Sequence, residues 1–373
     1  MLQDGPYEQI ISTITQEIRG GFPDAPKGCY IQLEKMASRY ILENIRASYG
    51  DSGWLVKRIA SFEEDTGIPL TLAGFLQHYR IDPRSIYKCA TFSRLLVRAD
   101  IFVDFDEPME DVFKKAMARL CCADSRRFIA FLLDLLPRVG KLDAADIAAL
   151  SGIERRMLQM FYVTVWGKTA DEWDGEALSN LHALSENPTH MFELLELLRY
   201  QFDQIDFIDE PVDVGFDCPL DLHCSYTRDQ LLVALDFLKP STVREGVKWL
   251  PDKKIDVLFV TLNKSDKDYS PTTMYEDYSI SEELFHWQSQ STTSADSPTG
   301  LRYVNHEARG SRVLLFVREF KQDRVLGSAA AYTFLGCARY VSHEGSRPMS
   351  VTWALARPIP AKYLKKTNKL VVG

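Results

Sequence analysis

The chain has 373 residues, of which 46% are hydrophobic and 26% charged, and its formal net charge at pH 7 is -8. This composition is that of an ordinary globular protein, and the length predicts two or more domains. No apolar run approaches the roughly 20 residues that span a bilayer, and residues 1–20 lack the pattern of a secretory signal. We therefore expect a cytoplasmic protein with no membrane partner.

Helical periodicity dominates the first half of the chain. Apolar residues recur with helical spacing over Ile31 to Ser48, Val112 to Leu120, Phe128 to Leu136 and Met191 to Phe202. In LDAADIAALSG, Asp143 is a predicted N-cap, Asp146 lies in the first turn, and Gly152 is the predicted end. These patterns predict a helical connector domain over residues 1–215.

The character of the chain changes at residues 205–222, which are acidic and contain two prolines. A last helix is predicted from Thr227 to Leu238. Runs rich in Val, Phe, Tyr and Leu then predict strands at Val257 to Leu262, Arg312 to Phe320, Tyr332 to Val341 and Met349 to Ala356. We predict an α+β protein in which the all-helical domain is followed by a β-rich domain, residues 216–373, with a barrel-like or curled sheet.

Seven cysteines are scattered along the sequence, and none forms a CxxC pair. The best candidate metal group is Cys218, His223 and Cys224, but its spacing fits no zinc-ligand pattern. We expect reduced thiols, no metal and no cofactor.

The most informative stretch runs from Ile255 to His306, where an apolar run gives way to a polar segment crowded with aromatic residues. Aromatic faces stack on bases, and Gln, Ser, Thr and Arg bind polar edges, so this mixture favours recognition of nucleic acid. In LFHWQSQSTTS, strand alternation predicts one face with Leu284, His286, Gln288 and Gln290, and the other with Phe285, Trp287, Ser289 and Ser291. Trp287 is a candidate for base stacking, and the glutamine amides are candidates for hydrogen bonding to adenine. The competing interpretation is that Trp287 belongs to the core.

Three further groups complete the predicted nucleic-acid site. Hydroxyls of Ser270, Thr272 and Thr273 suit phosphate oxygens, and Tyr275 and Tyr278 follow them. Arg302 and Tyr303 come from TGLRYV, and His343, Ser346 and Arg347 from SHEGSRP, a turn that would present Arg347 rigidly. The alternatives are a loop whose hydroxyls bond its own backbone and a histidine that only stabilises the turn.

The charge is unevenly distributed. Residues 1–215 have a net charge of -11, residues 216–373 a net of +3, and residues 300–373 a net of +9. Such a distribution is typical of a protein that binds a polyanion, so we expect the aromatic residues to face outward around a cationic groove. Lys362, Lys365, Lys366 and Lys369 are interpreted as a solvated tail.

Several long strings resemble one family: FVTLNKS, YSPTTMYEDYSISEELFHWQSQSTTS, SPTGLRYV, VLLFVRE and YTFLGCARYVSHEGSRPMSVTWAL. They are similar to the uncharacterised C-terminal region of bacterial superfamily II helicases that carry an N-terminal phospholipase-D-like nuclease, over about residues 220–364. GCYIQLEKMASRYILENIR resembles the helical segment that follows the second helicase lobe. The resemblance implies DNA processing or defence against foreign DNA, with a helicase motor and nuclease as partners in cis or in trans.

The sequence itself contains no GxxxxGK[ST], DExH or HKD-type motif, so it supplies no ATPase, helicase or nuclease site of those kinds. Three hypotheses remain open. The first is a DNA-binding accessory module, and YTFLGCARYVSHEG and MSVTWAL are similar to small barrels that read modified or flipped bases. The second is a metal-dependent nuclease or hydrolase that uses Asp256 and Glu276. The third is a structural module that docks a motor without binding DNA. The leucine stripe of MFELLELLRYQF is interpreted as core, and a face that docks a motor is the alternative.

Overall fold

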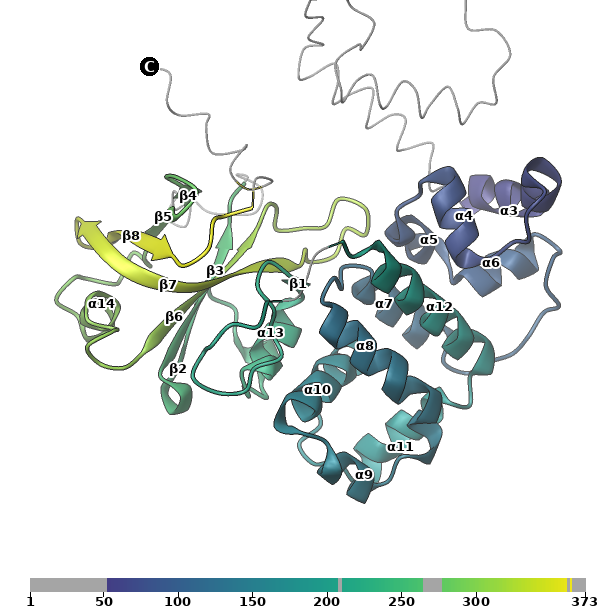
Figure 1. The fold of residues 1–373 in the computed structure, drawn as a ribbon, viewed down its shortest axis with the longest axis horizontal. Coiled ribbons are helices and arrows are strands. Elements are labelled where there is room, and N and C mark those ends of the chain that lie inside the picture. Colours follow the sequence, from purple (N-terminus) through teal and green to yellow (C-terminus); the bar gives the residue numbers. More distant parts are fainter. Residues whose placement is uncertain (1–51, 207–209, 264–276, 361–362, 364–373) are drawn as a thin grey trace, which may run out of the picture. The chain divides into compact units, whose positions relative to one another are not determined.

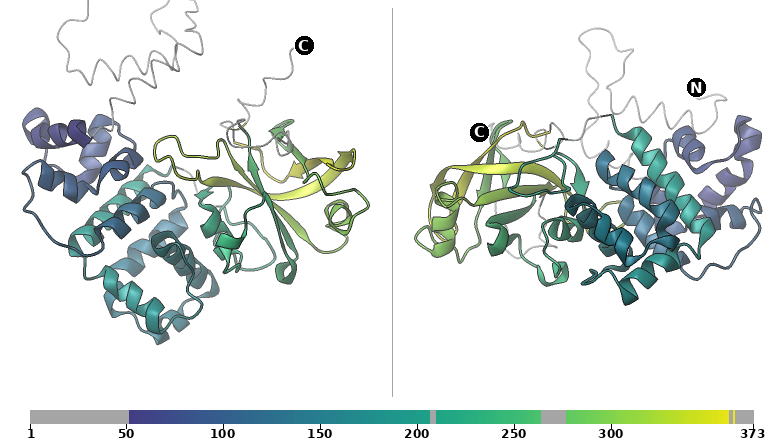
Figure 2. Two further views of the ribbon diagram at one scale, coloured as in Figure 1. Left: turned by 180° about the vertical axis from the view of Figure 1, so that it is seen from behind. Right: turned by 60° about the horizontal axis from the view of Figure 1, so that its bottom comes forward.

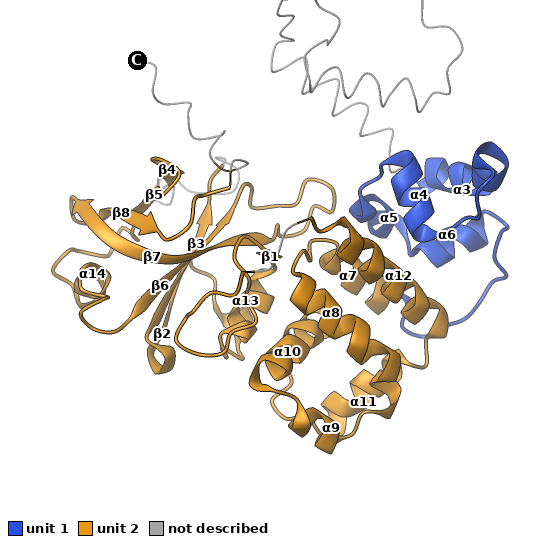
Figure 3. Ribbon diagram, viewed as in Figure 1, with its two compact units in different colours: residues 1–110 blue, residues 111–373 orange. Residues whose placement is uncertain are grey.

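The computed structural model describes residues 52–206, 210–263, 277–360 and 363 (Figure 1). The predicted helix from Ile31 to Ser48 and the lysine-rich tail lie outside these residues. Two compact units divide the chain, residues 1–110 and 111–373 (Figure 3). The predicted boundary at residue 215 stays a prediction, and it falls inside the second unit.

Four short helices form the described part of the first unit: α3 (Ser52–Thr66), α4 (Leu72–Tyr79), α5 (Pro83–Cys89) and α6 (Phe92–Arg98). Side-chain oxygens of Thr71, Asp82 and Thr91 accept hydrogen bonds from backbone N–H groups at the starts of the last three helices. These caps satisfy donors that the first turn of a helix leaves unpaired. Buried aromatic rings, including Phe62, Phe75 and Tyr79, fill the core between the helices.

The second unit begins with a helical layer. It comprises α7 (Glu110–Leu120), α8 (Arg126–Leu135), η1 (Leu136–Lys141), α9 (Ala144–Ala149), α10 (Gly152–Trp166), α11 (Gly175–Leu184) and α12 (Pro188–Gln204). Asp143 is the N-cap of α9, as predicted, and the structure adds that it forms a capping box with Asp146. The predicted helix end at Gly152 is wrong: this glycine begins α10, because Ser151 caps that helix and forms a second capping box with Glu154.

The rest of the unit is a mixed sheet with small helices, and the predicted α+β fold is confirmed. The elements are β1 (Ser225–Tyr226), α13 (Arg228–Ala234), η2 (Pro240–Thr242), β2 (Val247–Leu250), η3 (Pro251–Lys253), β3 (Ile255–Thr261), β4 (Tyr278–Ser279), β5 (Leu284–Gln288), α14 (Pro298–Val304), β6 (Arg312–Arg318), β7 (Tyr332–Glu344) and β8 (Ser350–Leu355). The strand order is β2-β3-β6-β7-β8-β5-β4, and β1 pairs with the start of β7. Only β3 and β6 run parallel among the described pairs.

The sheet curls around one core, as Figures 1 and 2 show. Its inner face buries side chains from β3, β5, β6, β7 and β8 together with Tyr303 of α14. The amide of Gln290, just after β5, donates to the carboxylate of Glu245, just before β2, at 2.7 Å. Because β2 and β5 lie near opposite edges of the strand order, this bond brings the two ends of the sheet together.

A buried polar junction joins the helical layer to the sheet. Asp221 is fully buried; Ser125 Oγ, at the start of α8, donates to its carboxylate at 2.7 Å, and Arg127 lies 2.7 Å from its other oxygen. Nearby, Asp124 accepts a hydrogen bond from the backbone N–H of Ser225. A buried carboxylate is stable only when it is paired in this way, so the junction fixes α8 against the start of the β-rich region.

Candidate nucleic-acid interface

Strand β5 separates the predicted side chains onto two faces of the sheet. Its burial alternates along Leu284–Gln288, so Phe285 and Trp287 enter the core while His286 and Gln288 are only half-buried on the outer face. Alternation with a period of two is the geometry of any strand. The predicted division of LFHWQ between two faces is therefore confirmed.

Antiparallel pairing continues the outer face over four strands. Tyr278 of β4 is opposite His286 of β5, His286 is opposite Thr352 of β8, and Thr352 is opposite Ser342 of β7. Residues directly opposite one another share a face, so these four side chains form one row. The rows on either side of it contribute Gln288, Ser350 and Glu344, and Leu284, Ala354 and Arg339. We call this surface the outer strip.

The rings of Tyr278 and His286 stack within the central row. Their centroids are 4.5 Å apart and their planes differ by 14°. The spacing matches the distance of about 4.8 Å between neighbouring strands, so both rings stand upright on the sheet and face each other across the gap. Asp277 accepts a hydrogen bond from the backbone N–H of Gln288 at 3.0 Å, which fixes β4 beside β5. An upright pair of rings can extend its stack onto a further flat group.

Two exposed arginines belong to β7 or to the turn that follows it: Arg339 in the row beside the central one, and Arg347 in the turn. Arg339 is exposed, and its side chain has no ion pair or hydrogen bond with the described residues. It is opposite Ala354 on β8, whose small side chain leaves space above that strand. Arg347 is exposed with φ at 64°, a conformation unusual for a residue with a side chain. Its backbone N–H bonds to Thr293 at 3.2 Å, so the turn after β7 is fixed while the guanidinium stays in solvent.

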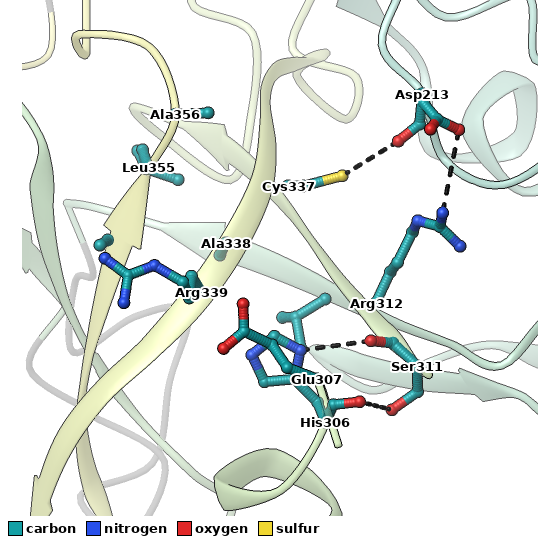
Figure 4. Close-up of a pocket in the computed structure, with 12 residues that line it drawn as sticks. Asp213, His306, Glu307, Ser311, Arg312, Cys337, Ala338, Arg339, Leu355 and Ala356 are labelled. Atoms are coloured by element: carbon teal, nitrogen blue, oxygen red, sulfur yellow. Dashed lines mark hydrogen bonds and ion pairs between the residues drawn. The ribbon is translucent and has the colours of Figure 1, made fainter. Parts of the chain in front are cut away.

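A pocket of about 410 Å³ adjoins the outer strip on the β6 side (Figure 4). Its polar lining includes Arg312, Glu307, Asp213 and Cys337. Arg312 and Arg339 both line the pocket, but their guanidinium groups point in opposite directions. Arg312 points toward Asp213, 3.9 Å away, and Arg339 points toward β8. Burial raises the pKa of the Cys337 thiol to about 11, so it stays neutral and is a poor nucleophile or metal ligand at neutral pH.

Two predicted binding aromatics lie on the other side of the sheet. Trp287 is 4% exposed and Tyr303 is 1% exposed, and their rings meet edge to face at 5.4 Å beside Trp353. The prediction that these rings face outward is wrong. Their large apolar area is worth more in the core of the curled sheet than on its surface.

Arg302 is also turned inward rather than toward a ligand. It donates two hydrogen bonds to Asp256, at 2.7 and 2.9 Å, and lies over the Trp249 ring at 4.2 Å. Burial raises the pKa of the Asp256 carboxyl, and the pairing with Arg302 offsets this only in part. Because both carboxylate oxygens are engaged by the guanidinium, the arrangement argues against Asp256 as a metal ligand. No group of three or more metal-binding side chains occurs among the described residues.

The remaining predicted residues are dispersed. Gln290 donates to Glu245, and His343 bonds to the hydroxyl of Tyr340 at 2.6 Å, on the face opposite the outer strip. Ser346 is exposed and accepts a hydrogen bond from the backbone N–H of Ala295. The predicted Ser270, Thr272, Thr273 and Tyr275, and the alternative Glu276, lie outside the described residues.

The surface differs from the predicted cationic groove in charge. Tyr278, His286 and Gln288 are predicted residues that the structure does bring together, but Glu344 lies in the adjoining row and Glu307 lines the pocket. The strip is therefore polar with isolated arginines. Sequence reasoning missed Arg339, Ser342, Ser350 and Thr352; the signal was present in MSVTWAL and GCARYVS, where small polar residues alternate with apolar ones.

Comparison with known families places a domain on this part of the chain. Residues 220–366 match the family described as Domain of unknown function (DUF3427). No curated protein matches the chain. The matched range contains every described strand together with α13 and α14. No helix in the described part of the chain is long and apolar enough to cross a membrane.

Proposed function

We propose that the DUF3427 domain of this chain, within residues 216–373, binds DNA through the outer strip. The observation that carries the proposal is the stacked Tyr278–His286 pair on the solvent side of the sheet. It is half-exposed, and hydroxyl and amide side chains surround it. Stacking on aromatic side chains, with polar groups at the edges, is how sheet surfaces recognise bases.

The resemblance of the sequence to helicase tails supplies the biological setting of this proposal. It implies that the domain serves a helicase–nuclease system in DNA processing or in defence against foreign DNA. In that setting the domain holds DNA while a motor and a phospholipase-D-like nuclease, in cis or in trans, act on it. The isolated arginines Arg339 and Arg347 would contact phosphates, which gives affinity without sequence information.

The test is binding of the whole chain to fluorescent oligonucleotides, measured by anisotropy over a range of salt concentrations. Tyr278→Ala and His286→Ala should each weaken binding by about 1–3 kcal/mol, the usual contribution of one stacked base. Both residues are half-exposed, so neither change should alter the unfolding midpoint much.

A matched control is Phe192→Ala, which removes a 60% exposed ring from α12, far in sequence from the strip. It should bind DNA as the unaltered chain does. The proposal fails if no oligonucleotide binds at low salt, or if the two strip variants and the α12 variant bind equally well.

A further inference from the structure

The outer strip has a gap in its aromatic stack above β8. The first two positions of the central row, on β4 and β5, hold the rings of Tyr278 and His286. The third position, on β8, holds Thr352, and the fourth, on β7, holds Ser342. Strands are about 4.8 Å apart, so a flat group standing above β8 would continue the stack at the spacing that the two rings already have.

The side chains beneath this gap are small. Along β8 the outer positions are Ser350, Thr352 and Ala354, and all three are half-buried. On one side of the gap stands His286, and on the other stand Ser342 and Arg339, both exposed. The distance between the flanking strands β5 and β7 is two strand spacings, or about 10 Å, which is enough for one aromatic ring between them.

The edges of the gap carry groups that bind polar atoms. Gln288 and Ser350 lie in the row at one end, where the glutamine amide donates to the serine hydroxyl at 3.3 Å. Arg339 lies in the row at the other end, and its guanidinium points over β8. An amide and a hydroxyl suit the edge of a base, whereas a guanidinium suits the phosphate that follows it.

We propose that this gap is a slot for one unpaired nucleobase, which stands above Thr352 and stacks on the His286 ring as the third member of the Tyr278–His286 stack. This inference rests on the proposed function and names the ligand as single-stranded nucleic acid. A paired base has both faces covered by its neighbours in the duplex and cannot enter the slot unless it leaves the stack.

The first experiment occupies the slot with an aromatic side chain of the protein itself. Thr352→Phe places a ring above β8, and an aromatic residue is well tolerated on a half-exposed strand. The variant should bind a single-stranded oligonucleotide about tenfold or more weakly, as expected when one base stack is lost. Thr352→Val keeps the size of the side chain and leaves the slot open, so it should bind more tightly than Thr352→Phe.

The second experiment measures stacking of the base itself, by fluorescence, and does not depend on a variant whose folding is in doubt. An oligonucleotide with one 2-aminopurine loses fluorescence when that base stacks on an aromatic ring. Its emission should fall when the whole chain binds it single-stranded, and His286→Ala should remove most of the fall. Arg339→Ala should weaken binding, whereas Arg244→Ala, at an exposed arginine before β2, should not.

The outcomes separate the two proposals. If no oligonucleotide binds, the proposed function fails. If single strands bind but 2-aminopurine is not quenched, or if folded Thr352→Phe binds as tightly as the unaltered chain, the slot is wrong and DNA binding stands. Equal affinity for duplex and single strand would likewise overturn the slot.

Discussion

The inner and outer faces of the same sheet carry similar residue types, but these residues pack in the core on one face and are exposed to solvent on the other. Trp287 and His286 are neighbours in the chain, yet one ring is sealed against Tyr303 and Trp353 while the other stacks on Tyr278 at the surface. Arg302 and Arg339 differ in the same way: one neutralises a buried carboxylate, and the other extends into solvent. Residue type alone therefore does not identify a binding residue, because position along the strand decides which face it occupies.

The comparison is tested most strongly by Trp287→Ala. Removing a fully packed ring from the inner face should lower the free energy of unfolding by about 3–5 kcal/mol, measured by urea denaturation. Molecules that remain folded should bind DNA normally, because the ring does not reach the outer strip. Trp287→Phe should cost less. A variant of normal stability with weakened binding would place Trp287 at the interface after all.

The two arginines provide the next contrast. Arg302→Ala leaves the Asp256 carboxylate buried without its partner, which should cost about 3–5 kcal/mol, whereas Arg339→Ala should change stability by no more than about 0.5 kcal/mol. Burial holds the pKa of Asp256 above its ordinary value, and loss of Arg302 should raise it further.

A folded-state pKa that is raised stabilises the fold at low pH, and this contribution is lost as the pH rises through that pKa. The free energy of unfolding that the Arg302→Ala variant loses relative to the unaltered chain should therefore grow as the pH rises from mildly acid to neutral. Urea denaturation at several pH values measures this loss. A deficit that is independent of pH would mean that Asp256 is not the group left uncompensated.

A smaller effect is expected at the junction between helices and sheet. Ser125→Ala removes both the N-cap of α8 and the hydrogen bond to buried Asp221, and should cost about 1.5–3 kcal/mol. Ser151→Ala removes only an exposed N-cap, from α10, and should cost about 1 kcal/mol. Equal losses in urea denaturation would show that the bond across the junction contributes nothing to stability.

The smallest effect concerns the salt dependence of DNA binding. Because the strip is polar and its arginines are isolated, we expect log affinity to fall only slowly with log salt concentration. Removing one arginine that binds a phosphate should reduce this slope by about 0.7 for a single strand. Arg339→Ala and Arg347→Ala should each cause a reduction of this size, measured as the change of log affinity with log salt. A steep slope that neither variant alters would locate the DNA on another surface.

Much of the fold was predictable because period and capping are local properties. The four predicted strands correspond to β3, β6, β7 and β8, and the predicted N-cap at Asp143 is present. The leucine stripe of α12 is core, with Leu194, Leu197 and Leu198 buried. The error at Gly152 arose because Ser151 is a strong N-cap, and the same glycine can follow one helix or start another.

The site was predictable only in part, because strand order and curl are set by contacts between residues far apart in sequence. Alternation separated His286 from Trp287, but it could not tell which of the two faces is inside. That choice follows from the tryptophans of β5 and β8 sharing one core. Thr352 is recognised as a site residue only through its register with β5 and β7, and Arg339 only through its register with β8.

The hydrogen bond between Gln290 and Glu245 has a consequence for solubility. A sheet that ends in free strands offers unpaired backbone groups to other chains, and long flat edges promote aggregation. Here the last strands at the two edges have four and two residues, and the bond draws the ends of the curl inward. Breaking it, for instance with Gln290→Ala, should make concentrated solutions of the protein aggregate sooner, even where the folded chain is scarcely less stable.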